Sequence, residues 1–152
     1  MGRKDEPRWL NQLVWSQPEL VHQLNTDRIP PGAGLYAFTR DGGLLSPLNV
    51  LYIGKADGAR QTLRTRLAVY LRRFSLYPAG KPAKHAGMEQ LAGYYSGAAK
   101  TLRVRWCGVI VAREIEGSLI HVFDPPFNNK DEHRLGFSDD ELIPDDLLYT
   151  WP

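Results

Sequence analysis

The sequence has a single cysteine, Cys107, only two methionines and no long apolar run among its 152 residues. One cysteine cannot form an internal disulfide, and it excludes a zinc site built from several cysteines. The longest apolar stretch, Cys107 to Ala112, is far shorter than the roughly 18 residues that a membrane helix needs. The charged N-terminus lacks the apolar segment of a signal peptide. We therefore expect an intracellular, cytoplasmic protein with no membrane partner.

The charges are nearly balanced overall but are separated along the chain. The net charge is +2, yet residues 55–113 carry twelve basic and two acidic side chains, a net charge of +10. Residues 114–152 carry ten acidic and two basic side chains, a net charge of −8. This separation favours a surface for a polyanion in the middle of the chain. A solvated face that pairs with the acidic C-terminal part remains an alternative.

The hydrophobic pattern predicts strands and helices in alternation, which indicates an α/β fold with a small antiparallel sheet of about three strands. Strands are expected at 34–40, 49–54 and 101–106, with Tyr36 and Phe38 on one face and Val50 and Tyr52 on one face. Apolar spacing typical of buried helix faces predicts helices at 60–73 and 113–123. Shorter helices are expected at 17–25 and 88–95, and Ser138 with Glu141 forms a possible capping box.

Four polar side chains occupy positions that this layout can bring together. Glu116 borders the buried face of its helix, where a carboxylate can bind a divalent cation such as Mg²⁺. Arg66 borders the apolar stripe of its own helix, where a guanidinium can neutralise a phosphate. Tyr36 and Tyr52 offer phenols from neighbouring strands. Each also has a structural interpretation, because bordering charges are commonly solvated and strand tyrosines commonly pack in cores.

Short motifs in order and register resemble the GIY-YIG nuclease family. The paired signature reads Gly34-Leu35-Tyr36 and Tyr52-Ile53-Gly54-Lys55, with leucine at the apolar middle position of the first element. The helix motif follows as LRTRLAVY over 63–70. The family's ending is matched by EGSLI over 116–120 and PPFN over 125–128. The resemblance covers about residues 32–128.

The length predicts a single domain, 1–152. The resemblance implies that its catalytic core is a GIY-YIG-like sandwich with helices flanking the sheet. The core spans about 32–128 and includes a basic, loop-like insertion at about 75–100. A helical extension over 1–31 precedes the core, and an acidic extension over 129–152 follows it.

The resemblance also implies how the matching residues act. Glu116 is expected to be the sole protein ligand of one Mg²⁺ or Mn²⁺ ion, and Arg66 to hold a non-bridging phosphate oxygen. Tyr36 is expected to accept the proton of the attacking water. Because a free phenol has a pKa of about 10, that role requires a lowered pKa, and Lys55 is expected to supply the cation that lowers it.

Three further motif residues are expected to support this chemistry. Tyr52 orients the water or the phosphate and remains an alternative general base. Tyr70 hydrogen-bonds near the same phosphate. Asn128 fixes the Glu116 helix or a nearby backbone group.

Basic side chains outside the motifs are expected to bind DNA: Arg64, Arg72, Arg73, Lys84, His85, Arg103 and Arg105. For His85 the preferred interpretation is a surface histidine, with DNA binding as the alternative.

Together these implications favour a divalent-metal-dependent DNA endonuclease that leaves 5′-phosphate and 3′-hydroxyl ends. The compact chain favours a restriction-type, phage or mobile-element enzyme that acts on double-stranded DNA, as a homodimer if it cuts both strands of a palindrome. Two alternatives remain open. One is a non-cleaving nucleic-acid-binding module on the same scaffold. The other is an interaction or regulatory protein that acts through its acidic C-terminal region.

Overall fold

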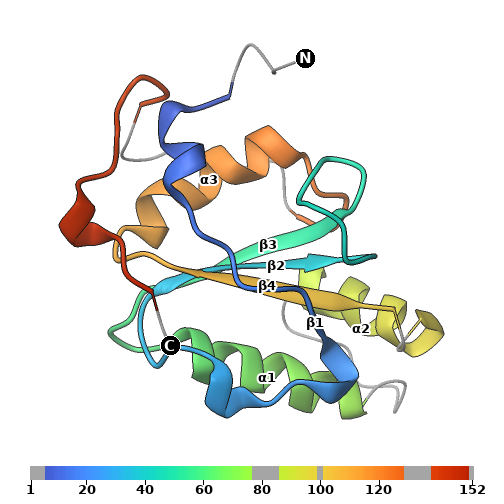
Figure 1. The fold of residues 1–152 in the computed structure, drawn as a ribbon. Coiled ribbons are helices and arrows are strands. Elements are labelled where there is room, and N and C mark those ends of the chain that lie inside the picture. The colour runs from blue at the N-terminus through green and yellow to red at the C-terminus, as the bar shows by residue number, and fades with distance from the viewer. Residues whose placement is uncertain (1–5, 77–85, 99–100, 129–137, 151–152) are drawn as a thin grey trace.

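An antiparallel sheet separates one layer of helices from another in the computed structural model, which describes residues 6–76, 86–98, 101–128 and 138–150 (Figure 1). The helix α3 covers one face of the sheet, and α1 and α2 lie on the other. The strands and α-helices are β1 (Glu19–Leu20), β2 (Gly34–Thr39), β3 (Val50–Ala56), α1 (Leu63–Leu76), α2 (Ala86–Ala98), β4 (Arg103–Gly108) and α3 (Ala112–Phe123). The α/β class and the antiparallel pairing agree with the prediction from sequence.

The sheet has four strands in the order β1-β4-β2-β3, where about three were predicted. The added strand, β1, lies inside the segment 17–25 that was predicted to be helical, and that prediction was wrong. A helix this short is marginal in isolation. Glu19 and Leu20 instead pair with Arg103 and Val104, so the outer edge of β4 supplies the backbone partners.

Two apolar cores form because successive side chains of the strands point to opposite faces. Tyr36 and Phe38 of β2 share a face, as predicted, and pack with α1 and α2, while Leu35 and Ala37 pack with α3. The predicted stripes of the two longer helices are buried against these cores, and α2 extends beyond the helix expected at 88–95. The sheet is therefore buried on both faces.

The expectation that Val50 and Tyr52 share a face was wrong. The pairs Phe38 with Tyr52 and Thr39 with Val50 advance one residue on β2 and two on β3, so Leu51 is an extra residue at a β-bulge. A bulge changes the alternation of side chains. Val50 consequently packs with α3, whereas Leu51 and Tyr52 face α1.

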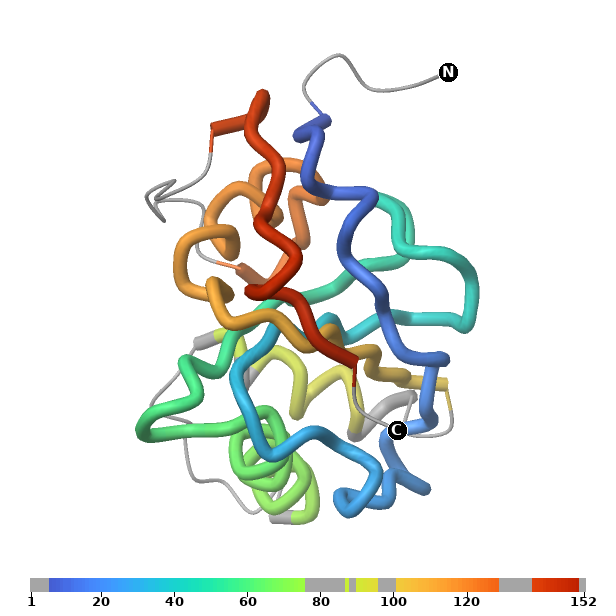
Figure 2. The backbone as a smooth tube through the Cα atoms, turned by 60° about the vertical axis from the view of Figure 1, so that its left-hand side comes forward, coloured from blue at the N-terminus to red at the C-terminus, as the bar shows by residue number. Residues whose placement is uncertain are grey.

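The two ends of the described chain run side by side on the α3 face (Figure 2). Gln12 exchanges two hydrogen bonds with the backbone of Ile143, at 2.8 and 2.7 Å. Ile143 is buried, and Leu148 bridges to Val109. Glu141 Oε1 accepts from the Ser138 N–H at 3.1 Å, as in a capping box, but the Glu141 N–H donates to the Ser138 carbonyl and no helix follows directly. The described part of the acidic C-terminal region is thus packed against the core.

None of the helices in the described ranges is both long and apolar enough to span a bilayer.

The loop between β2 and β3 is organised by one buried amide, that of Asn49. Its Nδ2 donates to Asp41 Oδ1 at 3.0 Å, to the Leu44 carbonyl at 2.9 Å and to the Gly43 carbonyl at 3.3 Å. Its Oδ1 accepts from the Ser46 backbone N–H at 2.9 Å. Leu44, on the same loop, is 85% exposed. The loop conformation therefore depends on polar contacts to Asn49 and not on burial of its leucine.

We predict that Asn49→Ala lowers the free energy of unfolding by about 1–3 kcal/mol, because it leaves several loop groups without their partner. Leu44→Ala is the matched control and should change stability by less than about 0.5 kcal/mol. Urea unfolding followed by tryptophan fluorescence measures both. Equal stability of the two variants would contradict this account of the loop.

Candidate active site

The Tyr36 side chain lies across the neighbouring strand at Gly54. A Cβ atom at Gly54 would overlap the Tyr36 ring, so this position of β3 must lack a side chain for the phenol to pack there. At Gly34 a Cβ atom would collide with the Cys107 carbonyl and with Leu63. The two glycines of the sequence motif therefore allow close contact between strands and between Tyr36 and β3.

The phenol of Tyr36 joins a hydrogen-bonded chain that reaches α1. Arg66 Nε donates to Tyr36 Oη at 3.2 Å, and Tyr36 Oη is 3.1 Å from Tyr70 Oη. The Arg66 guanidinium also lies 5.4 Å from the centre of the Tyr70 ring, within reach of a cation–π contact. Arg66 and Tyr70 are one helical turn apart on α1, which lets both meet the same strand residue.

The phenols are held in their neutral form. Burial raises the pKa of Tyr36 well above 10, and this effect exceeds the opposing influence of Arg66. Burial also raises the pKa of Tyr52 and of Tyr70. The lowered pKa that a general base requires is therefore absent from Tyr36 in the free protein. The cation beside Tyr36 is Arg66, which corrects the expectation that Lys55 fills this place.

Lys55 instead pairs with Glu116. The distance from Lys55 Nζ to Glu116 Oε1 is 3.1 Å, and the Glu116 side chain is only 10% exposed. Alternation along β3 turns Lys55 away from Gly54 and toward α3, which carries Glu116. Sequence reasoning missed this pair, although the period-two pattern of the strand held the signal. Burial and Tyr36 raise the pKa of Tyr52 most, and the negative charge of Glu116 adds to this rise.

Asn128 binds the open edge of β3. Its Nδ2 donates to the Ile53 carbonyl at 2.8 Å, and its Oδ1 accepts from the Ile53 N–H at 2.8 Å. The backbone N–H of Phe127 adds a third contact, to the Leu51 carbonyl at 3.1 Å. The chain after α3 therefore acts as a short neighbouring strand. The expectation that Asn128 fixes a nearby backbone group agrees with these contacts.

The donor set around Glu116 fits a divalent cation that keeps most of its water. Within the described ranges, no three His, Cys, Asp or Glu side chains gather closely enough to form a protein cage for a metal. Mg²⁺ is commonly held by one or two carboxylates together with water and substrate phosphate, so a single buried carboxylate is a sufficient protein ligand. A cation there has to compete with Lys55 for Glu116.

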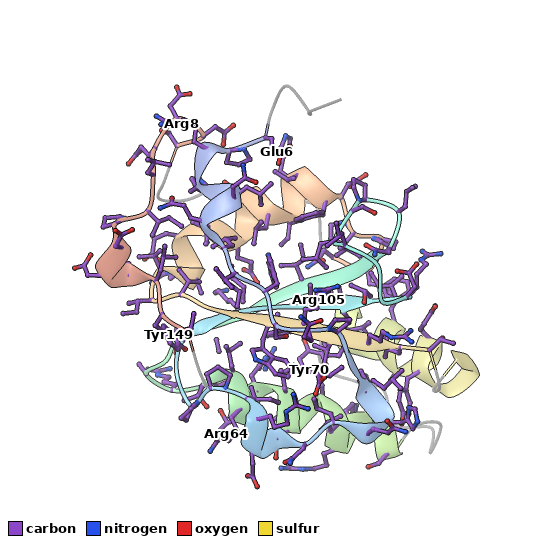
Figure 3. All side chains as sticks on the ribbon, in the orientation of Figure 1. Glu6, Arg8, Arg64, Tyr70, Arg105 and Tyr149 are labelled. Atoms are coloured by element: carbon purple, nitrogen blue, oxygen red, sulfur yellow. The ribbon has the colours of Figure 1, made fainter. Side chains whose placement is uncertain are left out.

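The basic residues expected to bind DNA fall into three groups, and Figure 3 shows two of the residues that are engaged within the protein, Arg64 and Arg105. Arg64 donates to the backbone carbonyls of Ile29 and Asp27. Arg105 donates to the carbonyls of Ser16, Gly42 and Gly43. Arg72 is exposed, and Arg73 and Arg103 are half-exposed, with Arg103 Nη1 also donating to the Thr101 carbonyl at 3.0 Å. Lys84 and His85 lie outside the described residues.

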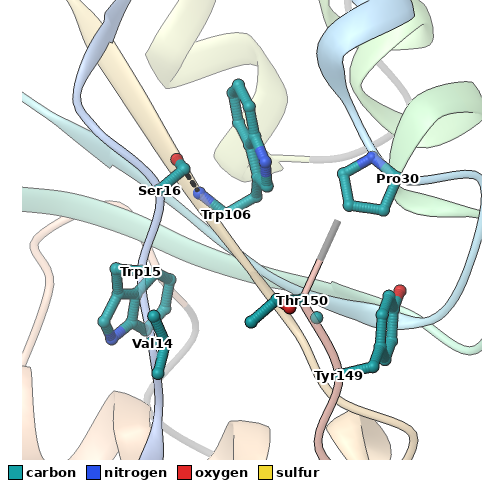
Figure 4. Close-up of a pocket in the computed structure, with 8 residues that line it drawn as sticks. Val14, Trp15, Ser16, Pro30, Trp106, Tyr149 and Thr150 are labelled. Carbon is teal, nitrogen blue, oxygen red and sulfur yellow. Dashed lines mark hydrogen bonds between the residues drawn. The ribbon is translucent and has the colours of Figure 1, made fainter. Parts of the chain in front are cut away.

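A separate hollow of about 110 Å³ lies near the C-terminal end of the described chain (Figure 4). Trp15, Trp106 and Tyr149 supply much of its wall, and none of its lining residues is charged. None of the candidate catalytic residues lines it. We therefore place the candidate site at the phenol chain and the β3 edge.

Comparison of the chain with protein-family models, with curated proteins and with solved structures found no match.

We predict that Gly54→Ala displaces the Tyr36 ring and lowers the free energy of unfolding by about 1–3 kcal/mol, because the added methyl group overpacks this contact. Gly42→Ala is the control, since a Cβ atom there meets its nearest neighbour at an ordinary 3.4 Å. Urea unfolding gives the stabilities, and near-ultraviolet circular dichroism reports the tyrosine environment. Unchanged stability and an unchanged spectrum in Gly54→Ala would show that the Tyr36 ring does not pack against Gly54.

We predict that the buried phenols make the fold sensitive to alkali. The pKa of Tyr36 is higher in the folded state than in the unfolded state, so the neutral phenol stabilises the fold. This contribution to the free energy of unfolding is complete below about pH 10 and is lost as the pH rises from there toward the folded-state pKa. The free energy of unfolding should fall above about pH 10, by at most about 1.4 kcal/mol per pH unit for each such phenol. Tyr36→Phe should reduce this slope, measured by urea unfolding at several pH values. If the free energy of unfolding falls equally steeply with pH in the wild type and in Tyr36→Phe, burial does not raise the pKa of Tyr36 as described.

Proposed function

We propose that this chain is a divalent-metal-dependent DNA endonuclease with a GIY-YIG-like sandwich, which hydrolyses phosphodiester bonds to 5′-phosphate and 3′-hydroxyl ends. The observation that carries the proposal is the hydrogen bond from Arg66 to Tyr36 on one side of the β3 edge, with the buried carboxylate of Glu116 on the other. The pKa of Tyr52 is influenced by both Glu116 and Arg66, after the larger effects of burial and Tyr36. A guanidinium from α1 and a phenol from β2 thus meet on one face of the sheet, and the α3 carboxylate pairs with Lys55 of β3 on the other.

In the proposed reaction each group has a distinct task. Arg66, half-buried and fixed by Tyr36, binds a non-bridging oxygen of the scissile phosphate and stabilises charge in the transition state. Glu116 holds a Mg²⁺ or Mn²⁺ ion, which when bound polarises the phosphate and stabilises the leaving 3′-oxygen. Asn128 keeps the β3 edge in register with the end of α3.

The proton of the attacking water passes to Tyr36 or Tyr52 in this proposal. Since burial raises the pKa of both phenols in the free protein, the reaction requires a lower pKa in the complex with DNA. Arg66 is the group beside Tyr36 that favours the phenolate. Tyr70 shares a hydrogen bond with Tyr36 and can redistribute the proton within the chain of phenols.

Double-stranded DNA is the proposed substrate, because the net charge of +10 over residues 55–113 suits a polyanion. Cutting both strands of a palindromic site requires two copies of one active site, so we propose a homodimer of restriction type.

A second candidate function is a nucleic-acid-binding module that does not cleave. Two observations favour it over cleavage. Lys55 already neutralises Glu116, and the phenols are strongly protonated. In that case the same cluster stabilises the fold and the basic surface binds nucleic acid.

We predict that Glu116→Gln lowers the rate of Mg²⁺-dependent nicking of supercoiled DNA by about 100-fold or more, because it removes the proposed ligand of the cation. Glu114→Gln, on the same helix but partly exposed, should cleave like the wild type. EDTA should abolish cleavage by the wild type. Nicking rates are measured at equal protein concentration on agarose gels.

Binding of DNA by the wild type without nicking in Mg²⁺ or Mn²⁺ would contradict the endonuclease and support the non-cleaving module. Equal nicking by the wild type and Glu116→Gln would contradict the proposed metal ligand. Arg66→Lys keeps the charge but loses the forked donor, so it should lower the rate while leaving the fold intact by circular dichroism.

A further inference from the structure

The loop that joins β2 to β3, residues 41–49, presents two leucines to solvent at its tip. Leu44 and Leu48 are each 85% exposed, the highest values among the exposed large apolar side chains in the described part of the chain. Figure 1 shows this loop projecting beyond the end of the sheet. Single exposed leucines are ordinary, but two on one short loop need a reason.

The loop is rigid, so the leucines are held outward by the fold. Asn49 binds the loop from within, as described above. From outside, Arg105 Nη2 donates to the carbonyls of Gly43 at 3.1 Å and Gly42 at 3.3 Å. Thr39 Oγ1 donates to the Asp41 carbonyl at 2.8 Å. Because the loop is ordered before any partner arrives, binding through its leucines carries little further entropic cost.

Two cationic side chains lie near the start of the loop. Arg40 is exposed at the start of the loop, and Arg103 is half-exposed on β4, where its side chain lies near Gly42. Asp41 is the acidic residue of the loop, and its carboxylate accepts hydrogen bonds from Asn49 and from the Gly43 N–H. An apolar loop with guanidinium groups nearby is complementary to the minor groove of DNA, where apolar wedges enter base steps and arginines bind in the groove.

We infer that the 41–49 loop is a minor-groove wedge, in which Leu44 and Leu48 enter a base step and Arg40 and Arg103 bind the adjacent phosphates. The inference deepens the proposed function, since it assumes that DNA is the substrate. The wedge lies on the same hairpin as Tyr36. Four residues of extended strand lead from Tyr36 to Arg40, about 13 Å at about 3.3 Å per residue.

Other occupants fit the loop less well. A second copy of the chain needs about 800 Å² on each partner for a stable interface, far more than two leucine side chains offer. A lipid bilayer is held only marginally even by a single myristoyl chain, which is longer than both leucine side chains together. DNA needs only a small apolar insertion, because the phosphate contacts supply much of the affinity.

The test compares the full-length wild type with the double variant Leu44→Ala/Leu48→Ala. Binding to a short fluorescent duplex is measured by anisotropy in EDTA, which prevents metal-dependent cleavage. A 2-aminopurine base placed at successive positions of the duplex reports unstacking. The matched control is Ile110→Ala/Leu142→Ala, which removes exposed apolar side chains that are 54% and 51% exposed. Ile110 follows the end of β4 that pairs with Gly34, at the opposite end of the sheet from the loop.

We expect the wild type and the control to bind the duplex and to raise 2-aminopurine fluorescence at one step. The double variant should bind the duplex about tenfold more weakly, because it lacks two leucine side chains that become buried in the complex. It should also lose the increase in 2-aminopurine fluorescence. The salt dependence of its binding should remain that of the wild type. Arg40→Gln/Arg103→Gln should instead lower the salt slope by about two.

Equal duplex binding by the wild type and the double variant would overturn the inference. Two other results would also overturn it. One is that the double variant loses binding to anionic phosphatidylserine vesicles but not to the duplex. The other is that its weaker duplex binding follows a change from dimer to monomer in sedimentation. A wild type that unstacks DNA without cutting it contradicts the proposed endonuclease and leaves the wedge standing. A wild type that cuts DNA, with a double variant that binds and unstacks it equally well, contradicts the wedge alone.

Discussion

The packing of the Tyr36 ring against Gly54 is the contact on which the rest of the candidate site depends. Without a side chain at Gly54, the ring lies against β3 and meets Tyr70 and Arg66 from α1. This contact joins the central hairpin to the first helix, and it removes the phenol from water. The same burial that orders the cluster also raises the pKa of Tyr36. In the proposed reaction, stability and chemistry therefore oppose each other at this residue, as they often do at functional sites.

Segments outside the three long strands pair with both edges of the β4-β2-β3 sheet. The segment along β3 also helps to form the candidate site. On β4, the N-terminal segment supplies β1 and the Ser16 contacts to Trp106. On β3, the amide of Asn128 exchanges two hydrogen bonds with Ile53. Exposed strand edges invite wrong pairing, so these contacts protect the sheet. The contacts of Asn128 also fix the chain that leaves α3, and Glu116 of this helix lies beside Lys55.

Local periodicity predicted the elements well where burial decides their structure, as in α1, α3 and the β2–β3 hairpin. It failed where a neighbour supplied backbone partners, because a nine-residue helix at 17–25 could not compete with pairing to β4. It also failed at Leu51, since a bulge changes the face of Val50 without a residue that marks it. The motif residues Tyr36, Arg66 and Tyr70 were expected together and do meet. The partner of Lys55 and the direction of the phenol pKa shifts depend on burial in three dimensions, which spacing along a chain does not report.

The most direct measurement is the chemistry of the ends left on nicked plasmid DNA. The full chain is incubated with supercoiled DNA in Mg²⁺, and the nicked product is then treated with DNA ligase. Hydrolysis at the proposed site leaves a 5′-phosphate and a 3′-hydroxyl, so we predict nicks that ligase seals directly. Parallel samples with EDTA should remain supercoiled. An absence of nicking, or nicks that ligase cannot seal without prior end repair, would contradict the account.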